Sequence, residues 1–184
     1  IIAAVLMAGF AGCTKKDAVS GAANLILATG GTSGTYYPFG GAMAQIWNTN
    51  IDGMNVTAQS TGASKENIRL VGKGEAELAI VQNDVMDYAL KGIELFSGEK
   101  VETFSTIATL YPEIVQIVVA KDSSINSVAD MKGKAISVGD AGSGVEANAK
   151  QILEAYGLTF DDLNARRLSF KESGAALKDK QIEG

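Results

Sequence analysis

Residues 25–90 alternate between short apolar runs and segments with helical spacing, and this alternation constrains the fold more than any other feature of the sequence. The apolar runs have the length and composition of buried strands, and glycine-rich or polar turns separate them from the helical segments. Because alternating strands and helices with short connections form parallel sheets covered by helices, we predict an α/β fold. The strands are predicted at 25–29, 54–58 and 78–81, and the helices at 37–47, 65–73 and 84–90.

A second block of the same kind follows the polar stretch 91–102. Two strands are predicted close together, at 105–110 and 114–120, with Tyr111-Pro112-Glu113 between them. After them we predict a short helix at 127–131, a strand at 135–138, a helix at 143–156, a strand at 165–170 and a helix at 173–182. We therefore expect a first α/β lobe over 25–110, then a crossover and an incomplete second lobe over 111–184. We interpret the chain as part of a longer protein.

Residues 1–12 are wholly apolar, but they are too few to span a bilayer, which takes about 20 residues. They fit the apolar core of a partial signal peptide that lacks its basic start. The stretch Phe10-Ala11-Gly12-Cys13 is similar to the lipobox of bacterial lipoproteins, so we predict that Cys13 is lipidated and that 13–24 include a tether. The alternative is a buried helix with an inert free cysteine; no intrachain disulfide is possible, because Cys13 is the only cysteine. A lipid on Cys13 would place the protein in the periplasm or at the cell surface, anchored to the membrane.

The composition excludes several classes of function. Sixteen Lys and Arg against twenty-one Asp and Glu give a net charge of −5, which argues against nucleic-acid binding. The chain contains no histidine, so serine–histidine and cysteine–histidine catalysis and histidine metal sites are excluded. We therefore predict no catalytic residue, no metal and no cofactor.

The glycine-rich segment Gly30–Pro38 lies between the first predicted strand and the first predicted helix. Backbone N–H groups of such a turn, together with the helix N-terminus, form an anion site to which hydroxyl groups add hydrogen bonds. Neither a dinucleotide fingerprint nor a P-loop fits, because the glycine spacing is wrong and no lysine follows. The alternative is merely a tight strand–helix turn. The candidate residues here are Thr32, Ser33, Gly34, Thr35 and Tyr36.

The segment Asp140–Glu146 repeats this arrangement after the predicted strand at 135–138. Gly142, Ser143 and Gly144 open the next helix, with Ser143 as a cap or as a donor to an anion. Two such sites that face each other across a cleft would hold a small carboxylate from both sides. The alternative is a helix N-cap alone.

Other polar residues follow the remaining predicted strands, where open α/β sheets bind ligands. Ser60 follows the second strand, and Gln82 and Asn83 follow the third, although Asn83 could equally cap the next helix. Tyr111 lies where the chain passes between the two blocks and would either form a wall of the cleft or pack in a core. Trp47 shares a helix face with Met43 and is predicted to be a core residue.

Five segments in order resemble one family. GGTSGTYYP, QSTGASKEN, GEAELAIVQNDV, TLYPEIVQIVV and VGDAGSGVEANA are similar to segments of the solute-binding subunits of TRAP transporters of the TAXI type, over about residue 25 to the end. The resemblance implies a periplasmic-binding-protein-like fold of type II, whose two α/β lobes are joined by crossing strands and close on a ligand. It implies no enzymatic activity, a small organic acid or amino acid such as glutamate, glutamine or a dicarboxylate as ligand, and TRAP membrane permease subunits as partners. The chief departure is length, because family members continue through the rest of the second lobe.

Two other classes remain open. An α/β enzyme would have to use Ser33 or Ser143 without a histidine or a GxSxG motif. A surface-anchored interaction protein would expose an apolar patch in place of a polar cleft.

Overall fold

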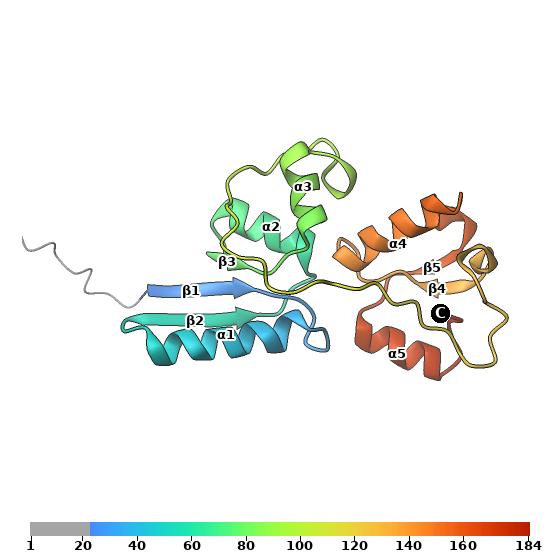
Figure 1. Ribbon diagram of the computed structural model, residues 1–184, viewed down its shortest axis with the longest axis horizontal. Helices are drawn as coiled ribbons and strands as arrows, with labels where there is room; N and C mark the ends of the chain where they lie inside the picture. The colour runs from blue at the N-terminus through green and yellow to red at the C-terminus, as the bar shows by residue number, and fades with distance from the viewer. Residues whose placement is uncertain (1–22) are drawn as a thin grey trace, which may run out of the picture.

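The structure is a computed structural model that describes residues 23–184 (Figure 1). The predicted signal peptide at 1–12, the predicted lipidation site Cys13 and nearly all of the predicted tether lie outside the described residues. Within residues 23–184, no helix is both long and apolar enough to cross a membrane.

The first lobe is built on a three-stranded parallel sheet, as predicted. Its strands are β1 (Ala23–Ala28), β2 (Met54–Gln59) and β3 (Leu78–Ala79), in the order β2-β1-β3. Strand β1 is central because the two crossovers place β2 on one side of it and β3 on the other. Helix α1 (Tyr36–Asn50) covers one face of the sheet, whereas α2 (Ser64–Lys73) and α3 (Asn83–Lys91) lie on the other (Figure 1). A short turn of 3₁₀ helix, Glu94–Phe96, follows α3.

The core of the first lobe lies between α1 and the sheet. Leu27 of β1, Val56 of β2 and Ile80, which follows β3, are buried in one cluster with Ala44 of α1. Met43 and Trp47 pack against this cluster, which confirms the prediction that Trp47 is a core residue. Side chains from consecutive strands meet here because parallel strands bury both of their faces.

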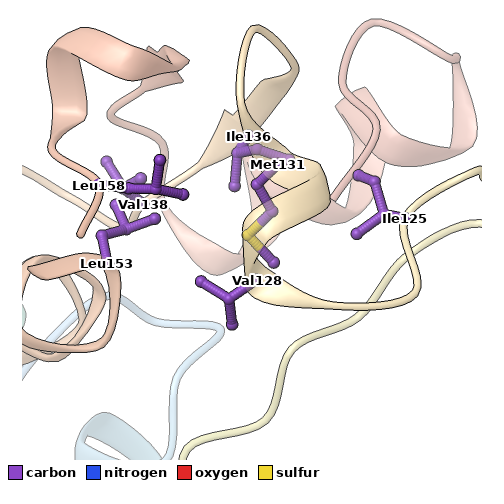
Figure 2. Packing of buried hydrophobic residues seen from close by; sticks show 7 residues of the cluster. All are labelled: Ile125, Val128, Met131, Ile136, Val138, Leu153 and Leu158. Carbon is purple, nitrogen blue, oxygen red and sulfur yellow. The ribbon is translucent and has the colours of Figure 1, made fainter. Parts of the chain in front are cut away.

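The second lobe repeats the pattern on a smaller scale. Strands β4 (Ala135–Ser137) and β5 (Asn164–Arg166) pair in parallel, and α4 (Gly144–Ala155) connects them. Short 3₁₀ turns lie at Val128–Met131 and Phe160–Asp162, and α5 (Phe170–Lys178) follows β5. Helix α5 begins earlier than predicted, because Ser169 and Glu172 form a capping box at its start. Figure 2 shows the buried cluster of this lobe, which consists of Ile125, Val128, Met131, Ile136, Val138, Leu153 and Leu158.

The strands predicted at 105–110 and 114–120 were wrong. Both segments run as an extended connection between the lobes without forming a ladder (Figure 1). Their apolar, β-branched sequence favours an extended backbone, but a strand also needs a neighbouring edge, and no described strand pairs with them. Ile107 and Ile114 are therefore 82% and 78% exposed. The two lobes with parallel sheets nevertheless agree with the predicted α/β fold class.

Candidate functional site

A cavity of about 920 Å³ lies between the two lobes. Its walls come from the turn after β1, the start of α2, Gln82 before α3 and the connection at 111–118. The second lobe contributes β4 with the turn after it, the start of α4 and residues of α5. The carboxyl ends of parallel strands meet at one edge of a sheet, so the turns that follow them gather at the same place. The predicted site residues that line the cavity are Ser33, Gly34, Thr35, Tyr36, Gln82, Tyr111, Ser143 and Gly144.

Four predicted site residues do not line this cavity. Ser60 instead holds the first turn, because its Oγ donates a hydrogen bond to the carbonyl oxygen of Gly30 at 3.0 Å. Gly142 donates its N–H to Glu146 Oε2 at 2.7 Å, and Asn83 lies on a second cavity beside β3. Thr32 lies in the first turn and is exposed.

Asn67 fixes the relative positions of the turns that form the site, and we did not predict this role. Its buried amide donates to the carbonyl oxygens of Thr29 at 2.5 Å and Ile80 at 2.8 Å. Its Oδ1 accepts a hydrogen bond from Thr61 Oγ1 at 2.6 Å. One side chain therefore ties the segments that follow β1, β2 and β3. The signal in the sequence was a polar residue next to Ile68 on the apolar face of its helix.

The hydroxyl of Ser143 acts as a helix cap. Its Oγ accepts a hydrogen bond from the N–H of Glu146 at 3.1 Å, and the residue is only 5% exposed. The alternative considered from the sequence, an N-cap, is therefore present at the cavity wall. Helix α1 differs, because Thr35 at its N-cap makes no side-chain hydrogen bond to the first turn. In the first turn of α1 the N–H groups of Tyr36 and Tyr37 have no partner inside the helix, whereas Pro38 has no N–H and Phe39 donates to the carbonyl oxygen of Thr35 at 3.1 Å.

Gln82 of the first lobe contacts the second lobe directly. Its Nε2 donates to Asn148 Oδ1 of α4 at 2.9 Å. A Cβ at position 144 would overlap the Gln82 side chain, so Gly144 permits this close approach. Gln82 and Gly144, which were both predicted to be site residues, thus lie next to each other where the lobes touch.

Glu113 lines the cavity on the connection between the lobes, and it was not among the predicted site residues. Tyr36 Oη donates a hydrogen bond to Glu113 Oε2 at 3.1 Å. Burial, reinforced by the charge of Glu113, raises the pKa of Tyr36 far above its ordinary value, so the phenol stays protonated as a donor. Burial also raises the pKa of Glu113. The neighbouring Tyr111 stacks edge-on against Phe39, with ring centroids 5.5 Å apart.

The charged side chains that line the cavity are acidic. Within residues 23–184 they are Glu113 and Asp140, and no lysine or arginine lines it. Lys65 packs beside Gly142, just before α4, and Arg167 Nε donates to Glu146 Oε1 at 2.5 Å; neither of them lines the cavity. Burial, together with the charge of Glu172, raises the pKa of Asp140. The described part of the chain contains no group of three or more histidine, cysteine, aspartate or glutamate residues suited to a metal ion.

Comparisons with known proteins agree with this architecture. Residues 27–184 match the sequence profile of the NMT1-like family. The structure is similar to that of the alkanesulfonate-binding protein SsuA from Xanthomonas axonopodis pv. citri bound to MOPS, with a TM-score of 0.61 and 17% sequence identity over 89% of this chain and 54% of that chain. It is also similar to the periplasmic aliphatic sulphonate binding protein SsuA from Escherichia coli, with a TM-score of 0.53 and 16% identity over 87% of this chain and 49% of that chain. The chain thus has a periplasmic-binding-protein-like fold and spans about half the length of these two solved chains.

Proposed function

The chain belongs to the NMT1-like family. We propose that it is the extracytoplasmic solute-binding receptor of a TRAP transporter of the TAXI type. In this proposal it captures a small organic acid or amino acid and delivers it to the membrane permease. The five sequence segments that resemble TAXI subunits support the transporter type. Lipidation of Cys13 would hold the receptor on the membrane in the periplasm or at the cell surface.

The observation that carries this proposal is the cavity between the lobes, whose walls come from both of them. A ligand that contacts both lobes stabilises a closed arrangement relative to an open one, because only the closed form makes every contact. Capture by hinge closure requires no chemical step, so the proposal includes no catalytic residue, metal or cofactor.

We assign the ligand carboxylate to the start of α1. The N–H groups of Tyr36 and Tyr37 in the first turn lack a side-chain cap, and Ser33 and Thr35 supply hydroxyl groups on the same wall. The N-terminus of a helix attracts an anion, and each neutral hydrogen bond contributes about 1 kcal/mol, more to a charged group. From the second lobe, the start of α4 would close the site with Ser143 and Gly144.

Ligand-induced stabilisation of the intact protein tests the proposal. The panel contains L-glutamate, L-glutamine, 2-oxoglutarate, succinate, malate and an alkanesulfonate, the last because two similar solved proteins are named as sulfonate-binding. At a hundredfold excess over Kd a true ligand adds about 2.7 kcal/mol to stability, which a thermal shift detects. An enzyme of the α/β class would in addition consume its substrate, which the same samples would reveal.

A matched pair of variants locates the site. Ser33→Ala should weaken binding of the ligand that emerges, because Ser33 lines the cavity. Thr32→Ala should leave binding unchanged, because Thr32 lies in the same turn and is equally exposed but does not line the cavity. Equal effects of the two substitutions would contradict the assignment to this turn.

A surface interaction protein is the second candidate, and the exposed apolar side chains of the connection favour it. Ile107, Ile114 and Val118 are 82%, 78% and 61% exposed. If no solute stabilises the folded protein but it associates with a purified partner through this segment, the receptor proposal fails and the interaction function replaces it.

A further inference from the structure

We propose that Asp84 is a positioning residue that fastens the second lobe to the first and holds the receptor closed before a solute binds. The inference rests on the proposed receptor function, and it concerns a side chain that does not line the cavity between the lobes. Asp84 is the second residue of α3 in the first lobe, and its carboxylate contacts α4 of the second lobe.

The two carboxylate oxygens of Asp84 bind different lobes. Oδ1 accepts hydrogen bonds from groups of the first lobe, which are the backbone N–H of Val85 at 2.9 Å and Gln82 Nε2 at 3.4 Å. Oδ2 accepts hydrogen bonds from two amides of α4, Asn148 Nδ2 at 3.2 Å and Gln151 Nε2 at 3.3 Å. One carboxylate therefore bridges the two lobes.

The amides around Asp84 match its carboxylate in chemistry and position. Asn148 and Gln151 are three positions apart, so their side chains lie on one face of α4. Asn148 Oδ1 also accepts a hydrogen bond from Gln82 Nε2 at 2.9 Å, which closes a ring of three side chains with Asp84. A carboxylate only accepts hydrogen bonds and each amide supplies N–H donors, so every member of this ring has a partner.

The hydrogen bonds of Asp84 should hold α4 more firmly than the ion pair at the same junction. Lys150 of α4 and Glu94 are 38% and 43% exposed, and pairs of this kind contribute little and are screened by salt. Hydrogen bonds to a carboxylate are stronger than those between neutral groups, and Asp84 receives two of them from α4. Loss of Asp84 should therefore shift the population toward open lobes.

The backbone N–H of Lys65 reports whether the lobes are closed. It donates to the carbonyl oxygen of Gly142, in the turn before α4, at 3.2 Å. Lys65 is the second residue of α2, where an N–H group has no acceptor inside its own helix, so its protection from hydrogen exchange requires the second lobe. The N–H of Asn67 donates to the carbonyl oxygen of Ala63 at 2.9 Å, within the first lobe, and reports on α2 alone.

The experiment measures amide hydrogen exchange by NMR on the intact protein without any solute. Asp84→Asn keeps the size of the side chain but replaces one acceptor oxygen with an N–H donor, which then faces the donors of one lobe or the other. We expect the Lys65 amide to exchange about ten- to a hundredfold faster than in the wild type, the range for hydrogen bonds to a charged group. Exchange of the Asn67 amide should stay unchanged.

Asp87→Asn is the matched control, because it removes the same charge from the same helix. Asp87 pairs with Lys91 of α3 itself at 2.7 Å and makes no hydrogen bond to α4 within residues 23–184. It should leave exchange at Lys65 unchanged. Asn148→Ala removes a partner from the side of α4 and should accelerate this exchange as Asp84→Asn does, so the test does not depend on the folding of one variant.

Three results would overturn the inference. The first is a Lys65 amide that exchanges without protection in the wild type, because the lobes are then open before a solute binds. The second is an effect of Asp84→Asn no larger than that of Asp87→Asn. The third is equal acceleration at Lys65 and Asn67, which indicates that α2 opens rather than that the second lobe is released. Each of these results leaves the receptor function standing, since that function is tested separately by solute-induced stabilisation.

Discussion

Substitution of two adjacent glycines in α1 measures how closely this helix packs on the sheet. A Cβ at Gly40 would lie 2.6 Å from Thr29 Cγ2 and 3.2 Å from Leu27 Cδ2, whereas a Cβ at Gly41 would meet nothing within 4 Å. Gly40→Ala therefore forces a methyl group into the buried contact between α1 and β1. Gly41→Ala adds the same methyl group to the same helix in open space.

The two substitutions share every contribution except packing. Alanine is favoured over glycine in a helix by about 1 kcal/mol, so Gly41→Ala should stabilise the first lobe by up to that amount. Gly40→Ala makes the same gain but incurs an overpacking cost of about 1–3 kcal/mol. Because the helix preference cancels, the difference in unfolding free energy between the variants should be about 1–3 kcal/mol.

Urea unfolding followed by fluorescence provides the assay. Trp47 is the only tryptophan and packs in the core beside α1, so its emission reports on the first lobe. With a denaturant dependence of about 1–3 kcal/mol per M, the midpoint for Gly40→Ala should lie lower than that for Gly41→Ala by on the order of 1 M. Coincident midpoints would refute the close packing of α1 on β1.

Two further predictions concern the turns. Asn67→Ala should lower the unfolding free energy by about 1–3 kcal/mol, measured by the same urea titration, because the carbonyl oxygen of Ile80 would lose its buried partner. N–H donors of Asn126 and Thr159 hold the pKa values of Asp130 and Asp162 below their usual range. A depressed folded-state pKa stabilises the protein above the unfolded-state value of about 4 and loses this effect as the pH falls through the folded-state value. At pH 7 the Tm of the double variant Asp130→Asn/Asp162→Asn should thus be lower than that of the wild type. In acid the Tm values of the two proteins should converge.

The order of strands and helices was predictable because it depends on local periodicity. Apolar runs of strand length and helical spacing are visible in any window of the chain, and Trp47 could be placed in the core from its helix face. The connection at 105–120 could not be predicted in this way. Its sequence favours strands, but strand formation depends on a partner edge, which no local pattern specifies.

The site was predictable where it depends on strand ends and unpredictable where it depends on distant contacts. The turns with Ser33 and Ser143 follow strands, so the rule for parallel sheets brings them together. Glu113 faces the cavity beside Tyr36, although 77 positions separate the two residues. The sequence also left open whether the Ser143 hydroxyl caps α4 or binds a ligand. In the structure it caps α4, because its Oγ accepts a hydrogen bond from the N–H of Glu146.

Several contacts already join α4 and the turn before it to the first lobe. Ala147 of α4 packs in an apolar cluster of the first lobe, and Gln82 donates a hydrogen bond to Asn148. Asn148 and Gln151 of α4 donate to Asp84 Oδ2 at 3.2 and 3.3 Å, and Gln151 also donates to the hydroxyl of Tyr88. The N–H of Lys65 donates to the carbonyl oxygen of Gly142 at 3.2 Å. Lys150 and Glu94 form an ion pair at 2.7 Å between partly exposed side chains, and exposed pairs of this kind contribute about 0–1 kcal/mol. A ligand shifts the balance between two arrangements of the lobes only by the difference between its affinities for them. A ligand that binds both lobes a few kcal/mol more tightly when they are closed is then sufficient to determine which arrangement is populated.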